Sequence, residues 1–311
     1  NASELDGRLR MQGFILDEGG NLALPDPETN PHNSGLKKRR DELFALSRKT
    51  RLIGRLHCDI FQQDKYLIEH VPLRVTLHRS PDDFCLMKAG GTTYKITISD
   101  MSLMIPRVRI GEAMRRSLES RLASGMLAQY NINRTVLHTH MVPSGSLNFH
   151  VPNLFRGRLP HTVVLAMVEA ANRKPDVAKN PFALNEFELQ KIVLSRNNVA
   201  VGIHSGLTVD FGDGYNYSNA YLNLLRNTGK MSGGSLISHL HFRRGFAIYP
   251  FKVVPQESMY TDASALNEGV LDLMLTFSTA TAANLDLFVY AQYNSTITID
   301  KERAVRIDGG S

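Results

Sequence analysis

The stretch Leu285-Asp-Leu-Phe-Val-Tyr-Ala-Gln-Tyr293 alternates between two kinds of position with a period of two residues. One face carries Leu285, Leu287, Val289, Ala291 and Tyr293, and the other carries Asp286, Phe288, Tyr290 and Gln292. Successive side chains of a β-strand point to opposite faces. The pattern therefore predicts a strand over residues 285–300 whose first face lies in a core.

Shorter strand-like runs occur along the rest of the chain. They cover residues 55–61, 73–79, 94–99, 103–110, 136–141, 161–171, 246–254 and 270–277. The run 161–171 has a fully apolar centre, which indicates a strand buried on both faces. Residues 192–196 and 199–203 flank Asn197-Asn198, a dipeptide that tolerates the positive φ of a tight turn, and they predict a hairpin.

Helical patterns are few. Ile110, Met114, Leu118, Leu122 and Met126 recur every four residues and predict one amphipathic helix over residues 112–129. A second, short helix is expected at residues 220–225. Many short strands with few helices are typical of an all-β sandwich and argue against a βαβ fold.

The composition is that of a globular protein. The 311 residues are 42% hydrophobic and 21% charged, with a formal net charge of +6, which excludes collagen, coiled-coil arrays and low-complexity chains. No run approaches the ~18 apolar residues that cross a bilayer. Cys58 and Cys85 are too few for a disulfide framework or a zinc site of their own, and their apolar neighbours predict two small buried side chains.

Sequence motifs of common enzymes are missing. The chain has no G-x-S-x-G elbow, no P-loop and no dinucleotide fingerprint. The paired carboxylates Asp82/Asp83 and Glu186/Glu188 are expected to be solvated, because no apolar flank is arranged to raise their pKa. We therefore expect no enzymatic activity and no cofactor.

Two alternative functions arise from clustered side chains. His138/His140 and His239/His241 have the i, i+2 spacing that places both rings on one face of a strand, as in cupin-type metal sites. No acid follows His140, however, and two arginines follow His241, so a metal is not expected. Tyr215, Tyr217 and Tyr221 could stack on a sugar in a carbohydrate-binding jelly roll, although such tyrosines more often pack at subunit interfaces.

A dense basic cluster lies near the start of the chain. It consists of Lys37, Lys38, Arg39, Arg40, Arg48, Lys49 and Arg51. Paired basic runs of this kind are typical of nuclear-import signals and of contacts to nucleic acid, including packaged DNA. A solvated helix start is the alternative.

Several stretches are specific enough to carry a family resemblance. They are residues 30–39 (NPHNSGLKKR), 54–61 (GRLHCDIF), 75–87 (VTLHRSPDDFCLM), 145–149 (GSLNF), 154–160 (LFRGRLP), 179–182 (KNPF), 288–294 (FVYAQYN) and 299–303 (IDKER). In this order, over nearly the whole chain, they resemble the hexon-type major capsid proteins of adintoviruses and of Polinton (Maverick) elements.

The resemblance implies a fold and an assembly. The fold would be a double jelly roll, with residues 1–134 forming the C-terminal part of the first jelly roll plus a linking helix and residues 135–311 forming the second. Because family members carry a substantial stretch before the matched part, we expect the chain, which begins at Asn1, to lack the opening strands of the first jelly roll.

The assembly implied is a homotrimer that forms pseudo-hexameric capsomers of an icosahedral shell. Its partners would be neighbouring capsomers and penton or minor capsid proteins. The protein would be located in the virion capsid, and assembly would take place in the host nucleus. A minor or penton-like jelly-roll capsid protein is the alternative within the same class. Residues 307–311 (IDGGS) resemble the cleavage pattern of adenovirus-type proteases, or form a flexible tail.

Overall fold

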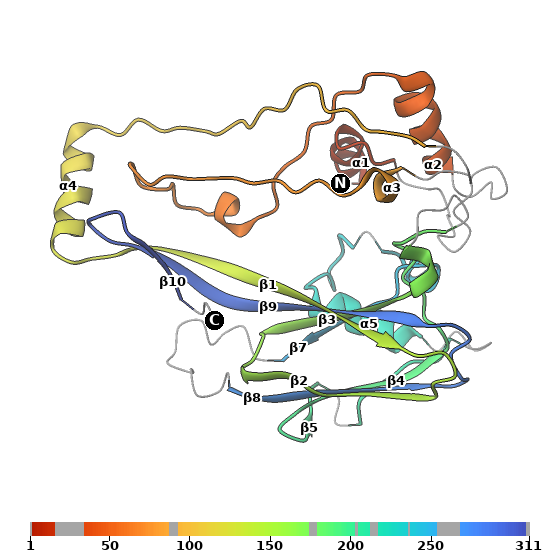
Figure 1. Ribbon diagram of the computed structural model, residues 1–311. Helices are drawn as coiled ribbons and strands as arrows, with labels where there is room; N and C mark the ends of the chain where they lie inside the picture. Colours follow the sequence, from red (N-terminus) through yellow and green to blue (C-terminus); the bar gives the residue numbers. More distant parts are fainter. Residues whose placement is uncertain are drawn as a thin grey trace. The chain divides into compact units, whose positions relative to one another are not determined.

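A computed structural model describes residues 2–15, 34–86, 93–173, 179–202, 205–211, 217–235, 237–253 and 268–308 (Figure 1). The chain divides into two compact units. Unit 1 comprises residues 1–55, 86–92 and 135–293, and unit 2 comprises residues 56–85, 93–134 and 294–311. The expected cleavage-like Gly309-Gly310 and Tyr215 of the tyrosine set lie outside the described residues.

Two antiparallel sheets form the larger part of the fold (Figure 1). The first contains β1 (Ala128–Val142), β9 (Leu285–Ile299), β3 (Thr162–Glu169) and β7 (Ile248–Lys252) in that order, with β10 (Val305–Ile307) beside β9. The second contains β2 (Asn148–Arg158), β8 (Glu268–Phe277), β4 (Leu189–Arg196) and β5 (Val199–Ala200), with β6 (Leu207–Thr208) beside β4.

Among the described strands, the chain passes from one sheet to the other at six of the nine connections. Strands β1, β3, β7 and β9 belong to the first sheet, and β2, β4, β5, β6 and β8 belong to the second. This interleaved antiparallel order is the jelly-roll arrangement. The predicted all-β class with a few short helices is confirmed, and one jelly roll is built from residues 128–299.

Side chains from both sheets meet in one buried core. The predicted inner face of β9 is confirmed, since Leu285, Leu287, Val289, Ala291 and Tyr293 are all buried. Strand β3 lies between β9 and β7 and is buried on both faces, as its apolar centre predicts. The sequence pattern therefore fixes the facing of the central strands correctly.

The predicted hairpin between β4 and β5 is also present. Asn197 and Asn198 both have positive φ, of 48° and 66°, and Arg196 pairs with Val199 across the turn. The Asn197 side chain accepts a hydrogen bond from the Val270 N–H at 2.9 Å. A Cβ on Gly269 would stand 2.8 Å from the Asn197 Oδ1, so this contact requires glycine.

Short helices and turns complete the described chain. These elements are α1 (Ala2–Met11), α2 (Ser34–Lys38), η1 (Arg39–Phe44), η2 (Ala45–Ser47), η3 (Asp59–Gln62), α3 (Asp82–Cys85), α4 (Glu112–Ala123), η4 (Ala170–Arg173), α5 (Ser218–Asn227) and α6 (His239–Arg243). Helix α5, predicted as a short helix, packs on the edge strand β7. The side-chain amides of Asn223 and Asn227 of α5 both donate to the Pro250 carbonyl of β7, at 2.8 and 2.9 Å. They thereby provide hydrogen-bond partners for a backbone carbonyl on the edge strand of the sheet.

Four strands expected in the first part of the chain are wrong. Residues 59–62 form the 3-10 turn η3, and residues 73–79, 94–99 and 103–110 belong to no strand. The predicted helix 112–129 is α4, which ends at Ala123 because the chain enters β1 at Ala128. The division of the chain into jelly rolls at residue 134 stays a prediction.

Candidate assembly surfaces

Unit 2 contains two long segments that the structure leaves without secondary structure, residues 73–79 and 94–105. They run as extended traces on either side of α3 in the chain (Figure 1). Many of their large apolar side chains are exposed, including Leu77 at 58%, Ile98 at 55% and Met104 at 92%. We call residues 73–79 and 94–105 the open segments.

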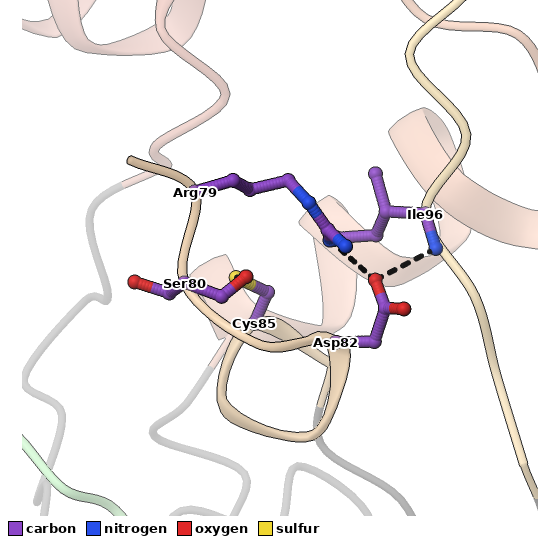
Figure 2. A network of polar contacts seen from close by, with 5 residues as sticks. All are labelled: Arg79, Ser80, Asp82, Cys85 and Ile96. Carbon is purple, nitrogen blue, oxygen red and sulfur yellow. Dashed lines mark hydrogen bonds and ion pairs between the residues drawn. The ribbon is translucent and has the colours of Figure 1, made fainter. Parts of the chain in front are cut away.

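A small polar network joins the two open segments (Figure 2). The Asp82 Oδ1 accepts a hydrogen bond from the Ile96 N–H at 3.1 Å. The same carboxylate forms an ion pair with the Arg79 guanidinium. The Arg79 guanidinium, followed by the Ile96 N–H, lowers the pKa of the Asp82 carboxyl. Asp82, expected to be simply solvated, therefore positions Ile96 opposite the end of the first open segment.

Further contacts tie residues 59–68 to β1 within unit 2. Tyr130 is buried; its hydroxyl donates to the Tyr66 carbonyl at 3.0 Å and accepts from the Ile68 N–H at 3.1 Å. The Asp59 carboxylate accepts from the backbone and side-chain N–H groups of Asn133, each at 2.8 Å. The backbone preceding the open segments is thus held in place by side-chain hydrogen bonds.

The basic cluster lies on α2, η1 and the residues that follow η2. Lys37, Lys38, Arg40, Arg48, Lys49 and Arg51 are exposed, and Arg39 is half-buried. Arg39 stacks over Phe14 at 5.0 Å, Arg40 pairs with Asp41 at 2.9 Å, and Arg48 donates to the Glu42 carbonyl. Six of the seven cations of the cluster are therefore at the surface, where their charge can reach a partner.

The histidine pairs occupy different structures. His138 and His140 lie on β1 with their rings stacked 6.5 Å apart, and His138 meets the edge of Phe155. His239 and His241 lie on α6 rather than on a strand, so their i, i+2 spacing directs them to different sides of the helix. Among the described residues, no three His, Cys, Asp or Glu side chains are grouped to hold a metal ion.

His239 instead belongs to an aromatic cluster with the tyrosines of the sugar-binding hypothesis. Its ring stacks on Tyr217 at 4.3 Å and meets the edge of Tyr221 at 5.2 Å. Tyr217 is 1% exposed, and it also stacks on Phe211. The hypothesis of a stacking platform at Tyr217 is therefore wrong, because this ring already packs on both neighbours inside the core.

Two further expectations fail for residues outside the regular strands. Glu186 was expected to be solvated, but burial raises the pKa of its carboxyl. Cys58 and Cys85 were expected to be buried, but both thiols are free and exposed. Both cysteines belong to the part of unit 2 whose predicted strands are not formed, so no core encloses them.

The described residues contain no helix that is both long and apolar enough to cross a membrane. The described residues form a hollow beside β5, lined by residues that include Arg196, Val201 and Lys252, and another lined by residues that include Leu127 and Arg306. The surface features that stand out in the described residues are the open segments and the basic cluster.

Comparison with known proteins gives solved structures alone, since no family model and no curated protein matches the chain. The chain is similar to PBCV-1 VP54 fitted into a reconstruction of the Sputnik virophage, with a TM-score of 0.40, 10% identity and coverage of 65% of this chain and 55% of that one.

Virophage proteins are among the similar structures as well. The Sputnik virophage structure has a TM-score of 0.37 at 15% identity, with coverage of 60% of this chain and 40% of that one. The mavirus major capsid protein has a TM-score of 0.32 at 12% identity, with coverage of 58% and 41%. The matched part thus spans between 40% and 55% of the length of these solved chains.

Proposed function

We propose that the chain is a structural capsid protein, a hexon-type major capsid protein similar to those of adintoviruses and Polinton elements. The observation that carries the proposal is the ordered series of capsid-like stretches along the sequence. Four of them overlap strands of the jelly roll: residues 145–149 and 154–160 overlap β2, and residues 288–294 and 299–303 overlap β9.

The energetics of the jelly roll support a structural role. Its core is filled by apolar side chains from both sheets, so the sandwich is a packed body and not a ligand-binding barrel. A shell protein gains its binding energy from extended interfaces, which in obligate assemblies bury ~2,000 Å² or more. In this proposal the chain forms homotrimers that act as pseudo-hexameric capsomers and contact neighbouring capsomers and penton or minor capsid proteins.

The experiment is a mass measurement on the longest polypeptide that the gene encodes. Native mass spectrometry of the purified protein should give a trimer, and negative-stain images should show hexagonal capsomers. A pentamer would replace the hexon assignment by the penton-like alternative. A protein that stays monomeric at all accessible concentrations would contradict both assignments.

The basic cluster supplies a second, separate part of the proposal. It serves nuclear import before assembly or faces the packaged DNA afterwards, because exposed cations attract nucleic acid and import receptors alike. Replacing Lys37, Lys38, Lys49 and Arg51 by Gln should abolish nuclear accumulation of a fluorescent fusion, or reduce the DNA content of particles.

The matched control is a variant in which the exposed Arg156 and Arg158 of β2 are replaced by Gln. This control removes two positive charges, against four in the cluster variant, and spares the cluster. Unchanged localisation and unchanged DNA content in the cluster variant would contradict this part of the proposal.

A further inference from the structure

We propose that the open segments, residues 73–79 and 94–105, accept antiparallel β-strands from a partner polypeptide whose strands carry an apolar face and an acidic face. The proposal depends on the surface of unit 2 alone and is independent of the capsid role. In binding by strand addition, main-chain hydrogen bonds give affinity, and alternate side chains give specificity.

The backbone of the open segments is available for such pairing. Within the part of the chain that the structure describes, the N–H and C=O groups of residues 73–79 and of 97–105 form no backbone hydrogen bond. Backbone polar groups are normally paired in folded proteins. A row of unpaired groups on a β-patterned segment is the template on which another strand pairs.

The side chains of the open segments alternate as strands require. Leu73, Val75 and Leu77 alternate with Arg74, Thr76 and His78, and Tyr94, Ile96 and Ile98 alternate with Lys95, Thr97 and Ser99. β-Branched and aromatic residues are those that favour strands. Residues 73–78 and 94–99 thus have the pattern of half-buried strands, although the structure leaves Leu77 and Ile98 exposed.

The exposed apolar area is large enough for a specific interface. Nine large side chains of the open segments are exposed by between 37% and 92%: Leu73, Val75, Leu77, Tyr94, Ile98, Met101, Leu103, Met104 and Ile105. At roughly 150–200 Å² for a fully exposed residue of this size, they present on the order of 900 Å². The six that share the faces of Leu73 and of Tyr94, namely Leu73, Val75, Leu77, Tyr94, Ile98 and Met104, account for roughly 600 Å² of this area, which reaches the upper end of the ~300–600 Å² patch of an ordinary monomer.

The charges of the open segments select the occupant. The polar face of the first segment carries Arg74, that of the second carries Lys95, and neither of these two faces carries an acid between residues 73 and 79 or between residues 94 and 99. Arg107 and Arg109 follow directly. A second copy of the same segments would place like charges across the new ladder, which is unfavourable, whereas acidic residues opposite these cations are favourable. The charge pattern therefore favours a partner strand with Asp or Glu at alternate positions over self-pairing.

The polar network of Figure 2 prepares the open segments for this partner. Asp82 holds the Ile96 N–H at 3.1 Å and also pairs with Arg79. The two segments are thereby connected at one point before a partner arrives. Such pre-organisation reduces the conformational entropy that is lost on binding.

The test uses the whole chain and a labelled nine-residue peptide that alternates Val or Ile with Glu. Fluorescence anisotropy should show saturable binding, at least tenfold tighter than for the same peptide with Lys in place of Glu. A scrambled Glu peptide without the alternation should bind at least tenfold more weakly as well. Hydrogen exchange should slow at residues 73–79 and 94–105 in the presence of the Glu peptide.

Variants separate strand pairing from general stickiness. Thr97→Pro removes an N–H from the ladder, and the pair Leu77→Lys and Ile98→Lys removes the apolar face; both should abolish binding. These side chains are exposed, so neither variant disturbs a core. The control is Leu222→Lys on α5, where a comparably exposed leucine is replaced outside the open segments; it should bind normally.

Three outcomes would overturn the proposal. The first is equal binding of the Glu and Lys peptides, and the second is full binding by Thr97→Pro. The third is protection of both open segments in the peptide-free chain together with a dimer in sedimentation, because a second copy would then be the occupant. Tenfold preference for the Glu peptide with loss in both open-segment variants supports the proposal.

Discussion

Replacing Leu287 by Ala should strongly destabilise the jelly roll. Leu287 lies on β9, which is paired on both sides by β1 and β3, and its side chain is 1% exposed. Three buried carbons are lost at about 0.8 kcal/mol each, and the cavity adds to this cost, so we expect a loss of about 3 kcal/mol, within the measured range for buried Leu→Ala changes.

Such a loss is a large part of the ~5–15 kcal/mol that stabilises a typical domain. For a domain of this size it corresponds to a decrease of the melting temperature by about 6–12 °C. The assay is urea denaturation followed by circular dichroism, in which the midpoint should fall while the slope stays unchanged.

The matched control is Leu137→Ala on β1, where the leucine is 60% exposed and the change should cost less than about 0.5 kcal/mol. If Leu287→Ala and Leu137→Ala lowered the midpoint equally, the assignment of β9 to the centre of the core would be refuted. A fall in both slope and midpoint would instead show that the variant no longer unfolds in one step.

Three further predictions follow from named contacts. Gly269→Ala should destabilise the fold by about 1–3 kcal/mol in the same urea assay, because its Cβ would stand 2.8 Å from the Asn197 Oδ1 and its φ is +153°; an unchanged midpoint would contradict the close approach. Tyr130→Phe removes the hydroxyl that bonds to Tyr66 and Ile68, at a cost of about 1–2 kcal/mol, and should speed hydrogen exchange at residues 66–68; exchange that stays as slow as in the parent would count against that tether. Burial, and then the neighbouring His138, lowers the pKa of His140, so the folded state binds this proton less readily than the unfolded chain and stability should fall as the pH drops below about 6.5. His140→Gln should make the melting temperature less dependent on pH between about 7 and 5, and an equally steep dependence in the variant would exclude His140 as a contributor.

The sequence predicted the jelly roll more accurately than it predicted unit 2. For β9 and β3, the pattern of apolar residues predicted both the strand and its buried faces. For the hairpin between β4 and β5, the Asn197-Asn198 dipeptide predicted the turn. Strand β2 was missed as an element, because its polar and aromatic residues do not alternate regularly; the positive φ of Asn153 and Gly157 and the register shift between Val151 and Phe155 interrupt the period.

The candidate surfaces were predicted in part. The basic cluster was visible as a run of cations, but its contacts to Phe14, Asp41 and Glu42 were not, because they join groups whose approach depends on the folded backbone. His239 shows the same limit, since its spacing to His241 suggested a chelating pair on a strand, whereas the helix α6 places it against Tyr217. Spacing defines a shared face only after the secondary structure is known.

Alternation alone determined which face of each strand-like run is apolar, both at Leu285–Tyr293 and at Tyr94–Ser99. The tertiary structure decided which of these runs became part of a sheet. A period of two is a local property of the side chains, whereas a strand exists through hydrogen bonds to a neighbour that is distant in the sequence. Residues 285–299 pair with β1 and β3 and bury their apolar face, whereas residues 94–99 have the same alternation but belong to no strand, and Tyr94 and Ile98 are exposed.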